Sequence, residues 1–223
     1  MGSRGRVVGF VGSKGGVGKT TCAVHFAALA ATVAPRVTLL DADPNEGSSA
    51  WIAEAAPAVH VERVRSSDQL LRAVPLLAAA CDLLVVDGPG NDSDATRSCL
   101  LRVDLAVLCS GVSLLDLSAL RDAIDALETV RDIRAGAPDA VILPSRFGQT
   151  RVAADALASM RGVGLLVVSP VPTRAVIADS PGQRRLAWDL DSAAAEPLRT
   201  TCSEILNHGK QTTPQHRRRP RRP

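Results

Sequence analysis

The chain has 223 residues, of which 46% are hydrophobic and 22% charged, a composition typical of a globular protein with one substantial domain. The sequence contains no apolar stretch of about 18 residues, which excludes a membrane-spanning helix. Its five cysteines, an odd number without a Cys-x-x-Cys pair, argue against a disulfide framework and a thiolate metal site, and we predict a cytoplasmic protein.

Short apolar segments alternate with longer helical segments along most of the chain. In chain order, strands are predicted at 6–11, 36–40, 59–64, 83–86, 105–109, 140–143 and 165–168, and helices at 19–33, 68–80, 117–134, 152–160 and 189–207. This alternation predicts an α/β fold with an open, mostly parallel sheet and helices on both faces. The carboxyl ends of parallel strands share one edge, and ligands bind at that edge in such folds.

The positive charge is concentrated after these elements. Residues 208–223 contain no acidic side chain and six basic ones: Lys210, Arg217, Arg218, Arg219, Arg221 and Arg222. The rest of the chain holds 20 basic and 23 acidic side chains, a net charge of about −3. Dense like charge without large apolar side chains is typical of disorder, so we predict a folded domain over residues 1–207 and a disordered basic tail over 208–223.

A glycine-rich loop, Gly-Ser-Lys-Gly-Gly-Val-Gly-Lys-Thr-Thr, joins the first predicted strand to the first predicted helix at residues 12–21. Between a buried strand and a helix, consecutive backbone N–H groups and the helix dipole bind phosphate, as in a P-loop. The standard pattern has glycine where this chain has Ser13. The predicted nucleotide-binding residues of the loop are Ser13, Gly15, Gly16, Val17, Gly18, Lys19, Thr20 and Thr21.

Three aspartates follow predicted strands and therefore lie at the same sheet edge. Asp41 and Asp43 come after the second strand, and Asp87 comes directly after the strand at 83–86. Hydroxyl and carboxylate oxygens are ligands that Mg²⁺ prefers, so the Thr20 hydroxyl of the P-loop pattern and these carboxylates lie where a magnesium ion needs ligands. An aspartate in this place can instead cap a turn, and the sequence does not rank Asp41 against Asp43.

The pattern Lys-Gly-Gly-x-Gly-Lys-Thr, with Lys14 early in the loop, resembles the deviant Walker A motif of the ParA/MinD family of P-loop ATPases. Residues 37–44 resemble the family's switch I, and residues 83–90 its Walker B strand and switch II. Residues 113–120 and 172–181 resemble later segments of small plasmid ParA proteins. The resemblance implies an ATPase with ATP and Mg²⁺ as cofactors.

The resemblance also implies roles for individual residues. Lys14 would reach the phosphates of the partner subunit in a nucleotide-sandwich homodimer, while Lys19 would hold the β- and γ-phosphates of its own subunit. Thr20 would bind Mg²⁺ directly and Asp87 through water, Asp43 would orient the attacking water, and Asp41 would support the metal shell. Pro172 and Arg174 would lie beside the base, although an ordinary loop explains them equally well.

The basic tail suggests a second binding activity. Arg217, Arg218, Arg219, Arg221 and Arg222 would neutralise phosphates of nonspecific double-stranded DNA. Together with the resemblance, this predicts a nucleoid-associated protein for plasmid partition or chromosome segregation, with a ParB-like partner and no membrane attachment. Two alternatives remain: a positioner of protein cargo, whose motifs would be the same, and a metabolic ligase similar to dethiobiotin synthetase, which shares the fold.

Overall fold

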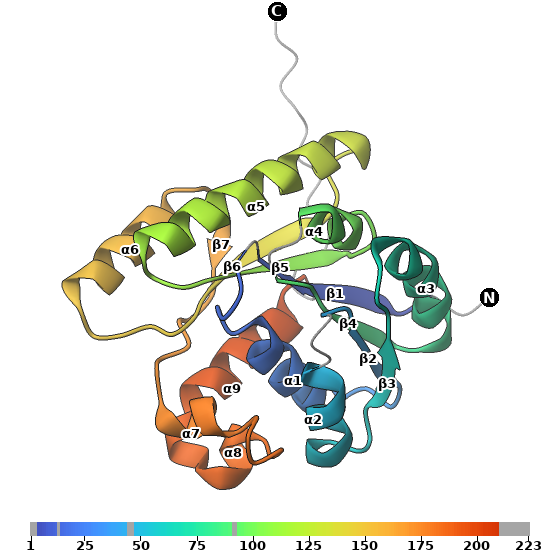
Figure 1. Ribbon diagram of the computed structural model, residues 1–223, viewed down its shortest axis with the longest axis horizontal. Helices are drawn as coiled ribbons and strands as arrows, with labels where there is room; N and C mark the ends of the chain where they lie inside the picture. The colour runs from blue at the N-terminus through green and yellow to red at the C-terminus, as the bar shows by residue number, and fades with distance from the viewer. Residues whose placement is uncertain (1–3, 13, 44–46, 91–92, 210–223) are drawn as a thin grey trace, which may run out of the picture.

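The structure is a computed structural model that describes residues 4–12, 14–43, 47–90 and 93–209. Its strands form one parallel sheet in the order β3-β2-β4-β1-β5-β6-β7 (Figure 1). The strands are β1 (Arg6–Val11), β2 (Val37–Asp41), β3 (His60–Arg63), β4 (Leu83–Asp87), β5 (Leu105–Ser110), β6 (Asp139–Pro144) and β7 (Leu166–Val167). The chain therefore winds outward in both directions from the central β1 strand, as in open α/β sheets.

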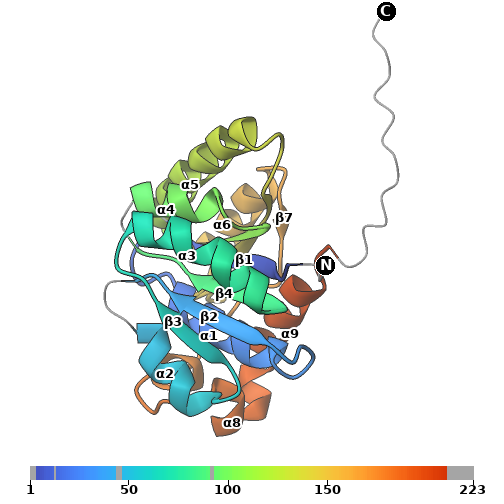
Figure 2. The same ribbon diagram turned by 90° about the vertical axis from the view of Figure 1, so that its right-hand side faces the viewer.

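Helices cover both faces of this sheet (Figures 1 and 2). One face carries α1 (Lys19–Ala30), α2 (Gly47–Ala55), α7 (Ala175–Asp179), α8 (Ala187–Leu190) and α9 (Ser192–Asn207). The other carries α3 (Ser67–Ala80), α4 (Ser93–Leu100), α5 (Leu114–Ile133) and α6 (Arg151–Arg161). No helix in the described ranges is long and apolar enough to cross a membrane.

Alternate residues of each central strand supply two separate hydrophobic cores. In β1, Val8 and Phe10 join the core beneath α1 and α9, whereas Val7 and Val11 join the core beneath α3, α4 and α5. All four side chains are at most 1% exposed, which explains why β1 reads as a continuous apolar run. The predicted α/β fold with a parallel sheet and helices on both faces is confirmed.

Several helix boundaries differ from the sequence prediction. Helices α2, α4 and α7 were not predicted, and the single helix predicted over 189–207 is divided into α8 and α9. Asp191 lies between the two with an extended backbone, and its carboxylate accepts a hydrogen bond from the Ala194 backbone N–H, so it caps α9. The predicted tail stays a prediction, because residues 210–223 lie outside the described ranges.

Strand register brings the predicted site residues together. Asp41 of β2 is directly opposite Asp87 of β4, and Phe10 of β1 is opposite Asp87 on its other side. The glycine-rich loop leaves β1 immediately beyond this point. Parallel pairing thus places two carboxylates from segments 46 residues apart beside the loop that precedes α1.

Candidate nucleotide and magnesium site

The loop between β1 and α1 has the backbone conformation of an anion-binding turn. Gly16 and Gly18 have φ of 75° and 86°, a left-handed conformation that side-chain-bearing residues rarely adopt. Gly18 is the N-cap of α1, and the first turn of this helix has neither an acidic residue nor a side-chain cap. Its backbone N–H groups and the positive end of the helix dipole can therefore bind an anion.

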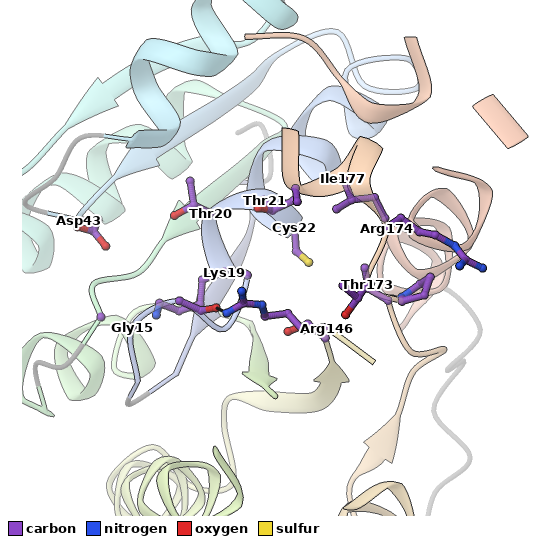
Figure 3. A pocket seen from close by; sticks show the side chains of 17 residues that line it. Gly15, Lys19, Thr20, Thr21, Cys22, Asp43, Arg146, Thr173, Arg174 and Ile177 are labelled. Carbon is purple, nitrogen blue, oxygen red and sulfur yellow. Dashed lines mark hydrogen bonds between the residues drawn. The ribbon is translucent and has the colours of Figure 1, made fainter. Parts of the chain in front are cut away.

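A cavity of about 460 Å³ opens beside this loop. Figure 3 shows Asp43 at one end and Arg174 and Ile177 at the other, with Lys19 and Thr20 between them. The lining therefore changes from charged and hydroxyl groups near the glycine-rich loop to a surface of both polar and apolar side chains near α7. This order matches the phosphates and base of a nucleotide.

The two lysines of the loop have different surroundings. Lys19 is 5% exposed, and its ammonium donates a hydrogen bond to the Lys14 carbonyl at 2.9 Å. Among the described residues, the buried ammonium is hydrogen-bonded only to this loop carbonyl, so it is well suited to bind an anion entering the cavity. Lys14 is more exposed and points out of the cavity toward α5.

Lys14 forms an ion pair with Asp116, in which Nζ and Oδ1 are 2.6 Å apart. Asp116 also closes the capping box of α5, because its carboxylate accepts hydrogen bonds from the Ser113 backbone N–H and hydroxyl. Burial alone would raise the pKa of Asp116, but the hydrogen bonds from Lys14 and Ser113 lower it overall. Asp116 therefore stays ionised and binds Lys14 within its own subunit.

Asp87 is a fully buried carboxylate at the end of β4. It is 0% exposed, and neither oxygen has a partner that meets hydrogen-bond geometry among the described residues. Burial, and then the neighbouring Asp41 carboxylate, raise the pKa of Asp87 to about 7, while Thr20, Ser48 and Lys19 act in the opposite direction. A cation bound beside Asp87 would stabilise the ionised form of this buried carboxyl.

Asp41 and Asp43, which the sequence does not distinguish, have different positions. Asp41 is buried, and its two oxygens accept hydrogen bonds from the backbone N–H groups of Asp43 and Ser49, at 3.2 and 2.9 Å. Asp43 is partly exposed and lines the cavity. Asp41 thus holds the segment after β2 in place, and Asp43 is the carboxylate that faces the nucleotide site.

The residues present fit a magnesium ion. The unpartnered oxygens of Asp87 lie close to the Thr20 hydroxyl, and Thr20 lines the cavity. Mg²⁺ typically uses one or two protein oxygens and takes its other ligands from water and substrate phosphates. Accordingly, the described residues contain no cluster of three or more potential metal-binding side chains.

Most of the predicted nucleotide-binding residues line the cavity. They are Gly15, Gly16, Gly18, Lys19, Thr20, Thr21, Pro172 and Arg174. Val17 is buried in the core instead, with its carbonyl accepting a hydrogen bond from the Ser145 hydroxyl. Ser13 and the five tail arginines lie outside the described residues.

The cavity lining also includes residues that the sequence did not predict, among them one polar pair after β6. Ser145 and Arg146 follow β6, and the Arg146 guanidinium donates a hydrogen bond to the Gly16 carbonyl at 2.8 Å. Arg146 has a φ of 53°, an uncommon value for a side-chain-bearing residue. The sequence did contain one indication that Ser145 and Arg146 belong to the site. They come directly after a predicted strand, as the other predicted site residues do.

Residues 8–187 match the family described as the CobQ/CobB/MinD/ParA nucleotide binding domain. The chain belongs to this family. The match includes the glycine-rich loop, Asp41, Asp43 and Asp87, and confirms the ParA/MinD resemblance.

Two kinds of relative illustrate the likeness. The chain is 35% identical over 120 residues to maintenance of carboxysome distribution protein A from Gloeobacter kilaueensis, an alignment that covers 53% of this chain and 55% of that protein. The fold of the present chain is similar to that of an ATP complex of a McdA variant from Cyanothece, with a TM-score of 0.79 and 15% identity. The superposition covers 92% of this chain and 97% of the McdA chain. A protein assigned to plasmid partition from Borrelia burgdorferi B31, bound to AMPPNP, has a TM-score of 0.71, 14% identity and coverage of 92% and 99%.

Proposed function

We propose that the chain is a Mg²⁺-dependent ATPase that forms a homodimer when ATP is bound and positions a cargo along DNA. The observation that carries the proposal is the cavity at the edge of the sheet. It combines a glycine-rich loop and a buried lysine, and beside it lies a buried carboxylate, Asp87, without a hydrogen-bond partner among the described residues. The ATP and AMPPNP complexes of similar fold support the choice of nucleotide.

The residues of the site have separate roles in this proposal. The loop N–H groups and Lys19 bind the phosphates, and Asp87 and Thr20 hold the metal, which when bound neutralises phosphate charge. Asp43, which faces the cavity, orients the attacking water. Lys14 leaves Asp116 and contacts the phosphates of the partner subunit, so the complete site requires two chains.

DNA binding and a ParB-like partner are the finer parts of the proposal. The five tail arginines would bind duplex phosphates without sequence preference, and dimerisation would double the number of tails. Hydrolysis, stimulated by the partner protein, would separate the dimer and release DNA. On this basis the chain acts in DNA partition within the nucleoid.

A protein-cargo positioner is the second candidate, and the 35% identity to a carboxysome distribution protein favours it. Both candidates share the nucleotide cycle and DNA binding, and they differ only in what the partner protein binds. A partner that recognises a specific DNA sequence would identify partition. A partner that binds a protein assembly would identify cargo positioning.

The first experiment measures ATP turnover, molecular mass and binding to random-sequence duplex DNA, with ATP, ADP or no nucleotide. We expect the mass to double and DNA to bind only with ATP. Nucleotide turnover without DNA binding at low salt would contradict the positioning function and favour the ligase alternative. Absence of nucleotide binding would contradict the assignment of the site itself.

A further inference from the structure

The first turn of α2 packs against the site proposed for magnesium. The Ser49 backbone N–H donates a hydrogen bond to Asp41 Oδ2 at 2.9 Å. Gly47 lies over Thr20, since a Cβ at this glycine would be 3.9 Å from Thr20 Cγ2. The turn thus contacts a residue proposed to bind the metal and the carboxylate that lies beside Asp87.

Ser48 lies between these two contacts. The side chain is 0% exposed, and its Oγ has no partner that meets hydrogen-bond geometry among the described residues. A buried hydroxyl without a partner lowers stability, because it has lost its hydrogen bonds to water. A partner present in another state of the site would therefore stabilise that state.

Asp87 provides the complementary group. Neither of its oxygens has a partner that meets hydrogen-bond geometry among the described residues, although the Ser48 hydroxyl is close enough to oppose the rise in the pKa of Asp87. Ser48 has a proton to donate, and Asp87 has lone pairs to accept it.

We propose that Ser48 is a positioning residue for magnesium: with the metal and nucleotide bound, its hydroxyl donates to one oxygen of Asp87 and orients the other toward the metal. This inference rests on the proposed function of the site. Partners that orient metal-binding groups typically contribute about 10- to 100-fold to metal affinity. Through Ser48, the start of α2 also becomes sensitive to the presence of the metal.

The test compares Ser48→Ala with the wild-type chain, using ADP to avoid turnover and Mn²⁺ as a spectroscopic probe of the metal site. We expect roughly 10- to 100-fold weaker Mn²⁺ binding to the ADP complex of Ser48→Ala. ADP affinity in EDTA should be unchanged. The nucleotide-free variant should melt at the same or a higher temperature, because an unpartnered buried hydroxyl has been removed.

Thr96→Val is the matched control. Thr96 also has a buried hydroxyl without a described partner, but it is on α4, which packs on the opposite face of the sheet from α2. Its removal should leave metal affinity unchanged.

Three results would overturn the role of Ser48 while leaving the proposed function intact: unchanged Mn²⁺ affinity in Ser48→Ala, equal loss of ADP affinity with and without metal, or a lower melting temperature of the nucleotide-free variant. If the wild-type chain binds no ADP at all, the proposed function fails, and the role of Ser48 fails with it.

Discussion

Lys14 and Lys19 are five residues apart in one loop, but their ammonium groups have different partners. We therefore expect the two side chains to respond differently when a nucleotide binds. Lys19 is buried against a carbonyl, which an incoming phosphate can replace without a change in side-chain position. Lys14 is 38% exposed and paired with Asp116. Partly exposed ion pairs are typically worth about 1 kcal/mol or less, so Lys14 can leave Asp116 at little cost.

We therefore expect different effects from removing each lysine. Lys19→Ala should abolish ATP binding, because it removes the ammonium inside the cavity. Lys14→Ala should leave ATP binding to the monomer intact but prevent ATP-dependent dimerisation and turnover. ATP affinity by calorimetry and mass with ATP by light scattering would distinguish the variants. An equal loss of ATP affinity in both variants would contradict the separate roles of Lys19 in ATP binding and Lys14 in dimerisation.

The two aspartates after β2 should also differ. Asp43→Ala should bind ATP and accumulate as an ATP-bound dimer, because the loss of a water-orienting carboxylate raises the chemical barrier and spares binding. Asp41→Ala should instead lower the free energy of unfolding by about 1–3 kcal/mol, because it removes the carboxylate that accepts two backbone hydrogen bonds. Single-turnover hydrolysis and urea unfolding test the pair. Normal hydrolysis by Asp43→Ala would transfer the water-orienting role to Asp41.

At the scale of elements, His25 links α1 to α8. From α1, its Nδ1 pairs with the Thr21 carbonyl at 2.7 Å, and its Nε2 with the Ala187 backbone N–H of α8 at 2.8 Å. Because the Ala187 N–H is a donor, Nε2 must be the acceptor, and the ring is neutral with its proton on Nδ1. Burial lowers the pKa of His25 to about 4, against the weaker opposing effect of the Thr21 carbonyl.

The lowered pKa of His25 makes the folded chain less stable as the pH falls. The folded-state pKa of His25 is below its unfolded value of 6.5, so the unfolded chain binds the proton first as pH falls. Its contribution to stability is complete above about pH 6.5 and should be about 2 kcal/mol smaller at pH 5. Asp87 acts in the opposite direction, because its pKa is raised and its contribution is lost as pH rises toward about 7.

The contribution of His25 to the pH dependence of stability is measured by comparison with His25→Gln, because the glutamine side chain does not titrate. We expect the free energy of unfolding of the wild-type chain, relative to this variant, to fall by about 2 kcal/mol between pH 7 and pH 5. Urea unfolding at the two pH values measures it. Parallel pH profiles for both proteins would show that His25 is not held neutral in the folded chain.

The elements that the sequence predicts well are those with a single clear pattern. The buried apolar strands β1, β4 and β5 were predicted within a residue, because parallel strands covered on both faces have nearly continuous apolar sequences. Helix α2 was missed because its sequence, Gly-Ser-Ser-Ala-Trp-Ile-Ala-Glu-Ala, begins with poor helix formers. Its stability comes from packing Trp51 and Ile52 into the core, which only the folded chain reveals.

The site was predictable to a similar extent. Local sequence predicted the glycine-rich loop, Lys19 and Thr20, and the strand-end rule predicted the aspartates. The contacts of Lys14 with Asp116 and of Arg146 with Gly16 join residues 102 and 130 positions apart. Sequence spacing contains no information about such pairs, because they depend on the pairing of β5 with β1 and of β6 with β5.

At the scale of the whole molecule, charge is divided between a mildly acidic body and a strongly basic end. The tail should therefore supply a large electrostatic share of DNA affinity. Deleting residues 209–223 should flatten the log–log salt dependence of binding by roughly 3–5 units, at about 0.9 per phosphate neutralised. The ATP requirement should persist, because dimerisation arises in the body.

The measurement is a titration of random-sequence duplex DNA at several salt concentrations, with full-length and truncated protein in each nucleotide state. An unchanged salt slope after truncation would assign the DNA contacts to the body. Equal DNA affinity with ATP, ADP and no nucleotide would show that the tail binds DNA independently of the nucleotide cycle.

The packing around His25 has an optical consequence. The chain has two tryptophans and no tyrosine, and both indoles pack edge-on against this one ring, with centroids 5.3 Å away for Trp51 and 4.8 Å for Trp188. Nearly all intrinsic fluorescence therefore originates from one cluster beside α1, the helix whose first turn faces the nucleotide. A change in emission when ATP is added would report movement of α1, α2 or α8 specifically, so the nucleotide cycle can be followed in the unlabelled wild-type chain.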